Sequence, residues 1–148
     1  MKLEIERKFL VKSDAFKTSI RKKYKITQGF LNKDKHRTVR VRIKENKGFL
    51  TIKGLSSKDG LSRLEWEKEI DVLEAKELLK LCEKPILSKT RFEILYNEKL
   101  FEVDEFHDEH EGLIIAEIEL KKESETFEKP DWLGEEVTGI KKYYNSQL

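Results

Sequence analysis

The sequence predicts an α+β fold built around one large antiparallel sheet. About eight stretches alternate between apolar and polar side chains, which is the period of a half-buried β-strand. One stretch, residues 71–84, has the spacing of a strong amphipathic helix. The 148 residues fit a single domain over 1–148, because no repeat, low-complexity tract or linker interrupts the pattern. A sheet of this size either stays open or closes as a barrel.

Capping and turn residues separate the predicted elements. The strongest helix begins after Asp71, a good N-cap, and ends before Pro85. A turn containing Gly48 divides two alternating stretches. The predicted helices cover 13–23, 71–84, 123–130 and 138–148, and the predicted strands cover 1–11, 25–32, 36–45, 47–54, 62–71, 89–96, 99–106 and 112–122.

Composition and charge exclude several classes of protein. Charged residues make up 41% of the chain, but 31 Lys and Arg nearly cancel 29 Asp and Glu, which leaves a net charge of +2. A protein that binds nucleic acid through bulk charge would be strongly basic, so no nucleic-acid partner is expected. No apolar run approaches the ~20 residues of a membrane span, and no signal-peptide pattern is present. With Cys82 as the single cysteine, we expect a soluble cytoplasmic protein without a membrane partner.

Each predicted strand has one apolar face and one strongly charged face. In the first, Ile5 and Phe9 oppose Glu4, Glu6 and Lys8. For a single strand, the simpler interpretation is a sheet with one face on a core and the other in water. The charged faces of all the strands together favour a different interpretation. Strands disfavour Lys, Glu and Asp, and like charges two residues apart repel each other. Grouped charges on strand after strand therefore favour a face that turns toward a ligand.

The charged faces fall into acidic groups and basic groups. Carboxylates bind hard divalent cations such as Mg²⁺ through oxygen. Arg and Lys bind phosphate oxygens, and Arg often does so through two parallel hydrogen bonds. If the sheet closes with both groups inside, the cavity suits a metal–polyphosphate complex, in which cations hold the anion and carboxylates hold the metal on its far side.

The motif Glu4-x-Glu6-x-Lys8 resembles the signature of the CYTH superfamily, the triphosphate tunnel metalloenzymes. The resemblance covers nearly the whole chain and is closest to short single-domain bacterial members. It implies an eight-stranded antiparallel barrel, or tunnel, with a charged interior and flanking helices. Further blocks follow in family order: TVRVRIK, LTIKG, SRLEWE, KTRF, FEVDEF, AEIEL and VTGIKKYYN.

The resemblance also implies roles for individual residues. Glu4, Glu6 and Glu119 match the carboxylates that hold one divalent metal, Mg²⁺ or Mn²⁺. Arg63 is expected to be structural, and either Lys141 or Lys142 could supply a cation from the C-terminal helix. Carboxylates around a second metal and its water match Glu65, Glu67, Asp104 and Glu117, and triphosphate-binding cations match Lys8, Arg40, Arg42, Lys53, Lys89 and Arg91.

The resulting hypothesis is metal-dependent hydrolysis of a triphosphate, with inorganic tripolyphosphate as the first choice of substrate. Thiamine triphosphatase and class IV adenylate cyclase are the enzymatic alternatives. A non-catalytic polyphosphate- or nucleotide-binding module would keep the cations and lose metal carboxylates, whereas this sequence has both. A second alternative is an interaction domain with a wet charged sheet face.

The stretch DEFHDEHEG (104–112) contains two histidines and several acidic residues but lacks the HExxH order of a zinc site. Apart from Asp104, it is interpreted as a hairpin loop. A homodimer stays open, because no interface can be identified from the sequence.

Overall fold

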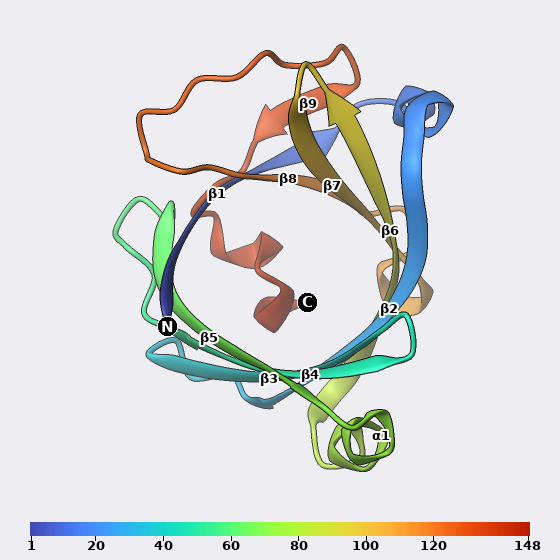
Figure 1. Ribbon diagram of the computed structural model, residues 1–148, viewed down its shortest axis with the longest axis vertical. Helices are drawn as coiled ribbons and strands as arrows, with labels where there is room; N and C mark the ends of the chain where they lie inside the picture. Colours follow the sequence, from blue (N-terminus) through green and yellow to red (C-terminus); the bar gives the residue numbers. More distant parts are fainter.

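The computed structural model describes all 148 residues, and its sheet closes into a barrel (Figure 1). Neighbouring strands pair in the order β5-β4-β3-β2-β6-β7-β8-β1, and β5 also pairs with β1, which closes a ring of eight antiparallel strands. This confirms the predicted α+β barrel; the ninth strand, β9, pairs with the C-terminal part of β1. The strands are β1 (Lys2–Val11), β2 (Ile20–Asn32), β3 (Arg37–Lys44), β4 (Lys47–Gly54), β5 (Ser62–Ile70), β6 (Glu83–Tyr96), β7 (Lys99–Phe106), β8 (Ile114–Glu119) and β9 (Leu133–Glu136).

The helices are short. α1 (Val72–Leu79) is capped by the Asp71 carboxylate, which accepts hydrogen bonds from the backbone of Leu73 and Glu74. Its buried Ala75 approaches the barrel so closely that a Cβ at Gly48 would lie 2.7 Å from the Ala75 Cβ. No helix has the length and apolar character that crossing a membrane would require. The 3₁₀ helices are η1 (Asp14–Ser19), η2 (Asp108–His110), η3 (Lys141–Tyr143) and η4 (Asn145–Gln147). α1 and η1 lie outside the barrel, whereas the C-terminal η3 and η4 lie within its ring (Figure 1).

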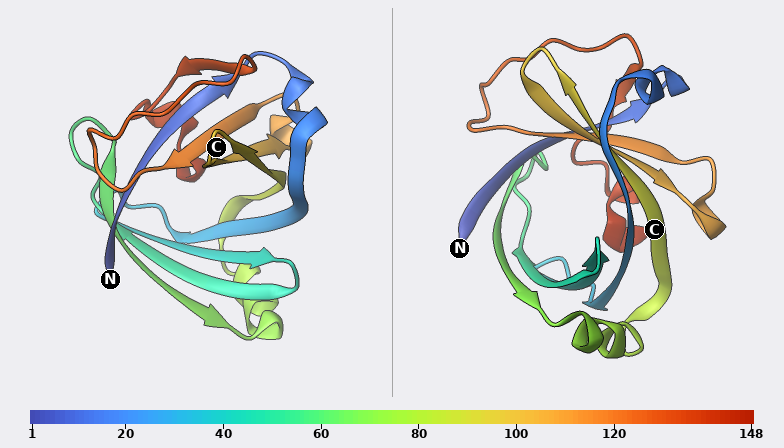
Figure 2. Two further views of the ribbon diagram at one scale, coloured as in Figure 1. Left: turned by 45° about the horizontal axis from the view of Figure 1, so that its top comes forward. Right: turned by 45° about the vertical axis from the view of Figure 1, so that its right-hand side comes forward.

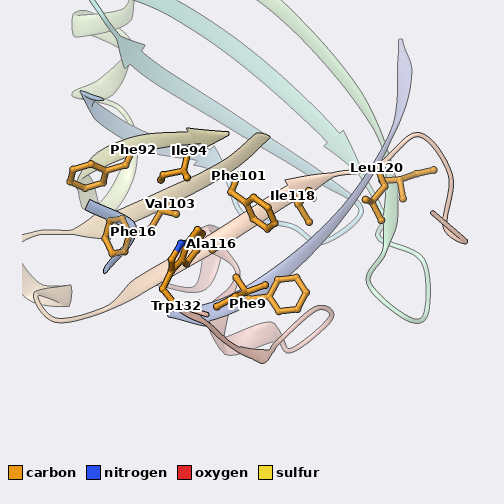
Figure 3. Close-up of a cluster of buried hydrophobic side chains, with 12 residues drawn as sticks. Phe9, Phe16, Phe92, Ile94, Phe101, Val103, Ala116, Ile118, Leu120 and Trp132 are labelled. Carbon is orange, nitrogen blue, oxygen red and sulfur yellow. The ribbon is translucent and has the colours of Figure 1, made fainter. Parts of the chain in front are cut away.

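The main hydrophobic core lies outside the barrel wall (Figure 3). The outward side chains of β1, β6, β7 and β8 form one side of this core, with Phe101 completely buried. Phe16 of η1 and Trp132, which precedes β9, cover them with edge-to-face aromatic contacts. Figure 2 shows η1 and the chain after β8 lying over this part of the barrel. Apolar residues therefore point outward to a covering layer, while the alternating charged residues point into the lumen.

The C-terminal segment, residues 139–148, turns into the barrel and ends inside the ring (Figure 1). Its Tyr143 and Leu148 pack against a small cluster of Leu87, Phe106 and Ile115. The segment enters past Gly139, whose φ is +78° and whose Cβ, if present, would lie 2.6 Å from the Asp59 carbonyl oxygen. Contacts with the barrel therefore fix the path of this segment.

Several predicted helices are wrong or too long. Residues 13–23 form only η1, because the chain from Ile20 onward pairs with β6 and extends β2. The helix over 71–84 ends at Leu79, since β6 begins at Glu83 and includes Pro85. Residues 123–130 are irregular, and Phe127 packs on the main core. The segment 138–148 forms only η3 and η4, while β9 was not predicted at all.

Replacing Ile118 tests the core outside the barrel. Ile118 is 1% exposed, so Ile118→Ala leaves a cavity and should lower the free energy of unfolding by about 2–5 kcal/mol in a urea titration. Leu81→Ala removes a side chain of similar size that is 74% exposed, and it should change this free energy by less than about 0.5 kcal/mol. Equal losses in the two variants would contradict the placement of the core.

Candidate active site

The barrel encloses a highly polar cavity. Of the 26 residues that line it, three are hydrophobic. The prediction that the charged strand faces turn inward is confirmed. Twelve of the sequence-predicted site residues line this cavity: Glu4, Glu6, Lys8, Arg40, Arg42, Lys53, Glu65, Glu67, Lys89, Arg91, Glu117 and Glu119.

One acidic group in the cavity is already paired with lysine. The Lys53 ammonium lies 2.8 Å from the Glu4 carboxylate and 3.4 Å from that of Glu65. Burial raises the pKa of Glu4, but Lys53 outweighs burial and the net shift is downward. Burial and the neighbouring Glu4 charge raise the pKa of Glu65. Glu119 lies nearer to solvent, with its side chain 60% exposed and 3.2 Å from Lys2.

A second acidic pair, Glu6 and Glu117, has no cation of the protein within 4 Å of either carboxylate. Burial raises the pKa of Glu6 well above its usual value, and the charges of Glu117 and Glu4 add to this. Burial acts in the same direction on Glu117, but the Lys8 charge and a hydrogen bond with Glu6 lower its pKa to about 2. The pKa of Glu6 is thus raised while that of Glu117 is lowered. Opposite shifts in two neighbouring carboxylates are typical of a pair that shares a proton or binds a cation.

The carboxylates of Glu4, Glu65, Glu6 and Glu117 have the chemistry that a divalent metal requires. They offer only oxygen donors, which suits a hard cation such as Mg²⁺. They come in twos, Glu4 with Glu65 and Glu6 with Glu117, and no three of them converge into a formed metal centre. Glu6 and Glu117 have no ion pair with a protein cation, so a bound cation there would relieve their mutual repulsion, and the residues fit a divalent metal.

The basic side of the cavity contains a guanidinium with free hydrogen-bonding capacity. Arg40 Nη2 donates to the Thr51 hydroxyl at 3.2 Å and lies 3.6 Å from Glu67, while its Nε is buried without a partner. Burial lowers the pKa of Arg40, an effect that Glu67 partly opposes. A buried N–H without an acceptor is costly, so an anion reaching Arg40 would satisfy it.

Arg42 is held by a neutral partner instead of a carboxylate. Its Nε and Nη2 both donate to the side-chain oxygen of Gln28, at 2.9 and 2.6 Å, and Gln28 is completely buried. Burial, followed by the charges of Arg40 and Arg91, lowers the pKa of Arg42 to about 9. The positive charges on this side therefore exceed the acidic groups that contact them.

Asp104 does not line the cavity, although it was predicted to bind metal. It is 1% exposed, and its oxygens accept hydrogen bonds from Arg91 at 2.8 and 2.9 Å and from Lys89 at 2.7 Å. Burial opposes ionisation of Asp104, but Arg91 and Lys89 outweigh it and hold its pKa far below the usual range. Burial lowers the pKa of Lys89 to about 7 against the pull of Asp104. In this structure Asp104 is the counter-ion that anchors two cavity cations.

Lys142 also lies away from the cavity. It is exposed, and its ammonium lies over the ring of Tyr143 at 5.1 Å, while Lys141 is exposed as well. The 3₁₀ turns of the C-terminal segment bring other groups inward: Lys8 Nζ donates to the Tyr143 carbonyl oxygen at 3.3 Å, and Tyr144 lines the cavity. The expected C-terminal cation is therefore replaced by backbone and neutral side-chain groups.

Sequence reasoning missed several polar residues of the lumen. Thr51 and Glu102 share the charged face of their strands, and this alternation was a signal that could have found them. Gln28 lies on a strand whose pattern is less regular, and Asn145 belongs to a segment expected to be helical, so neither carried a clear signal. The other lining residues that were not predicted are Lys2, Phe30, Thr38, Ser56, Gly60, Leu61, Thr138, Gly139, Tyr144 and Ser146. Arg63, which was expected to be structural, lines the cavity as well.

Comparison with known proteins shows the family to which the chain belongs. The model of the CYTH domain family matches residues 2–146. The chain belongs to the CYTH domain family. CYTH triphosphatases are in general metal-dependent. The inorganic triphosphatase of Acetivibrio thermocellus is 52% identical over 98% of this chain and 92% of its own length. That of Nitrosomonas europaea is 36% identical over 98% and 95%. The crystal structure of the inorganic triphosphatase NE1496 has a TM-score of 0.69 and 32% identity, and it covers 97% of this chain and 95% of that one.

Asp104→Asn tests the anchoring role in this CYTH domain. Removing the charge leaves Lys89 buried without an anion and Arg91 with only Glu102 at 3.3 Å, so the free energy of unfolding at pH 7 should fall by about 3–5 kcal/mol. Because the folded-state pKa of Asp104 is depressed, its contribution is present above the unfolded pKa of about 3.9 and is lost as pH falls below it. The variant should therefore lose less stability on acidification than the wild type.

The control for this variant is a surface ion pair. Glu105 lies 2.9 Å from Lys17, with side chains 27% and 41% exposed, so Glu105→Gln should change the free energy of unfolding by less than about 1 kcal/mol. Denaturant titrations from pH 2 to 7 measure both variants. A loss for Asp104→Asn no larger than that of the control would refute the anchoring role.

Proposed function

We propose that this protein is an inorganic triphosphatase, which hydrolyses tripolyphosphate to pyrophosphate and phosphate with a divalent metal, Mg²⁺ or Mn²⁺. The observation that carries the proposal is that one lumen contains both the carboxylate pair Glu6–Glu117, which has no ion pair with a protein cation, and the cations around Arg40. The 52% identity to an inorganic triphosphatase over 98% of the chain supports the same substrate.

The basic side of the lumen binds the triphosphate chain. Arg40 offers a buried Nε without a partner, and Arg42 and Lys89 have donors beyond those that Gln28 and Asp104 occupy. An anion among these groups relieves the mutual repulsion that lowers the pKa of Arg42. Because negative charge builds up on the leaving pyrophosphate, the same cations stabilise the transition state of hydrolysis.

The acidic side of the lumen holds the metal. Glu6 and Glu117 would be the first to hold the metal, and Glu4, Glu65 and Glu119, which line the same cavity, would complete its surroundings. When bound, the metal neutralises charge on the phosphate oxygens and lowers the pKa of a water that attacks phosphorus. The carboxylates themselves fix where the cation lies relative to the arginines on the opposite side.

The lining favours an inorganic substrate over a nucleotide or thiamine triphosphate. Its three hydrophobic residues are Phe30, Leu61 and Tyr144, which is little surface for an organic ring. The C-terminal segment also occupies part of the lumen. A non-catalytic binding module would not need the uncompensated carboxylate pair. A single domain over 1–148, a cytoplasmic location, the absence of a nucleic-acid ligand and a homodimer stay predictions from the sequence.

Glu6→Gln tests the metal side. The substitution keeps the shape of the side chain and removes its charge, so phosphate release from tripolyphosphate with Mg²⁺ should fall at least about 10²-fold. Because Glu6 is repelled by Glu117, the melting temperature should not fall. The control is Glu109→Gln, an exposed carboxylate in η2. Excess EDTA should abolish release by the wild type. Wild-type turnover by Glu6→Gln would show that the metal ligands are assigned wrongly.

Arg40→Ala tests the phosphate side. Losing a charged hydrogen-bond donor should raise the KM for tripolyphosphate about 10- to 100-fold. Arg37→Ala is a matched control, because Arg37 lies on the same strand but is exposed and pairs with Asp34. Steady-state phosphate release at varied tripolyphosphate concentration measures both. Equal KM values for the two variants would be incompatible with a phosphate contact at Arg40.

A further inference from the structure

A buried hydrogen-bond network connects the C-terminal segment to the cations of the lumen. The side-chain oxygen of Asn145 accepts two hydrogen bonds, from Lys89 Nζ at 2.9 Å and from the side-chain amide of Gln28 at 2.7 Å. Both donors are almost completely buried, with 1% and 0% of their surface exposed. Asn145 is therefore the meeting point of two groups that come from neighbouring strands of the barrel.

The network continues from Gln28 to Arg42. The Gln28 oxygen accepts from Arg42 Nε and Nη2, so the Gln28 amide must turn its nitrogen the other way, toward Asn145. Asn145 thus sets the orientation of Gln28, and Gln28 sets that of the Arg42 guanidinium. Asn145 therefore orients Lys89 by a direct hydrogen bond. It orients Arg42 indirectly, through Gln28.

Occupying some donors of a cation fixes the direction of the others. An ammonium has three N–H donors, and Lys89 directs two of them at Asp104 and Asn145, so the third has a defined direction. Arg42 similarly uses Nε and Nη2 on Gln28 and keeps its other N–H groups available. The nitrogen of the Asn145 amide has no protein partner, and Asn145 lines the cavity.

We propose that Asn145 is a positioning residue for triphosphate, through which the C-terminal segment orients Lys89 and Arg42 toward the substrate. The inference rests on the proposed function, because that function supplies the ligand, inorganic triphosphate. The segment then completes the substrate site in addition to filling one part of the lumen. Its docking is specific, since Tyr143 and Leu148 pack on the barrel and Gly139 lies against the Asp59 backbone.

Tripolyphosphate binding and turnover by Asn145→Ala test this role. The dissociation constant is measured by calorimetry in EDTA, and KM and kcat are measured with Mg²⁺. We expect the dissociation constant and KM to rise about 10-fold, with kcat changing less than about threefold, because misdirected cations weaken binding more than the chemical step. Asn145→Ser, whose hydroxyl is too short to reach both donors, should behave like Asn145→Ala and serves as the second variant.

A double variant and a control separate positioning from a general structural effect. If Asn145 acts on Arg42 through Gln28, the two substitutions remove part of the same interaction. The dissociation constant of Gln28→Ala/Asn145→Ala for tripolyphosphate should then rise by less than the product of the two single increases. Gln147→Ala, an exposed residue of the same segment, should bind and turn over like the wild type. Melting temperatures confirm that each variant is folded.

The outcomes distinguish this inference from the proposed function. Wild-type affinity and KM in Asn145→Ala and Asn145→Ser would overturn the positioning role and leave the triphosphatase proposal standing. Effects that multiply in the double variant would overturn the part of the role that acts on Arg42 through Gln28. A wild type that binds tripolyphosphate but releases no phosphate would overturn the enzymatic function alone, and weaker binding by Asn145→Ala would still support its role. A wild type that does not bind tripolyphosphate would overturn both.

Discussion

The lumen depends on one buried carboxylate. Asp104 is in contact with Arg91 through two hydrogen bonds and with Lys89 through a third, and all three groups are at least nine-tenths buried. Isolated buried cations would be prohibitively costly, so the barrel can place them next to one another only because an anion of the chain lies behind them. Arg91 also lies 3.3 Å from Glu102, so two carboxylates balance Lys89 and Arg91. The excess of positive charge that the lumen can offer to a phosphate chain comes from Arg42, which is held by Gln28 instead of a carboxylate.

The two faces of the strands have different roles: the outward face stabilises the fold, and the inward face is available to a ligand. Outward side chains such as Phe101 and Ile118 make the main core with η1 and the chain before β9, while inward neighbours such as Glu102 and Glu117 face the lumen. The interior of this barrel is thus its polar side, and its hydrophobic core is a layer on one outer wall. Charges inside can be arranged for a ligand because burial outside stabilises the fold.

The sequence predicted the parts of the structure that depend on local alternation. A strand repeats every two residues, so Glu4, Glu6 and Lys8 had to share a face, and the family motif indicated that the face is internal. Parts that depend on docking were not predictable: η3 and η4 follow the contacts of Gly139 and Leu148 with the barrel. Alternation placed Asp104 on the charged face but could not show how deeply it lies or that Lys89 and Arg91 occupy both of its oxygens. Tertiary pairing, absent from any local pattern, likewise extended β2 beyond the predicted start.

The two carboxylate pairs also differ in a way that connects metal binding to phosphate binding. Glu6 and Glu117 have no ion pair with a protein cation, whereas Glu4 and Glu65 share the single positive charge of Lys53. Lys53 lies 2.8 Å from Glu4 and 3.4 Å from Glu65, so its positive charge is already shared between two carboxylates before a phosphate binds. Under the proposed function, Glu4 and Glu65 would release Lys53 to the triphosphate if they held a metal, and Lys53, once drawn to the triphosphate, would leave these carboxylates without their cation. Each ligand therefore favours the other by linkage, because both replace ion pairs that share one side chain.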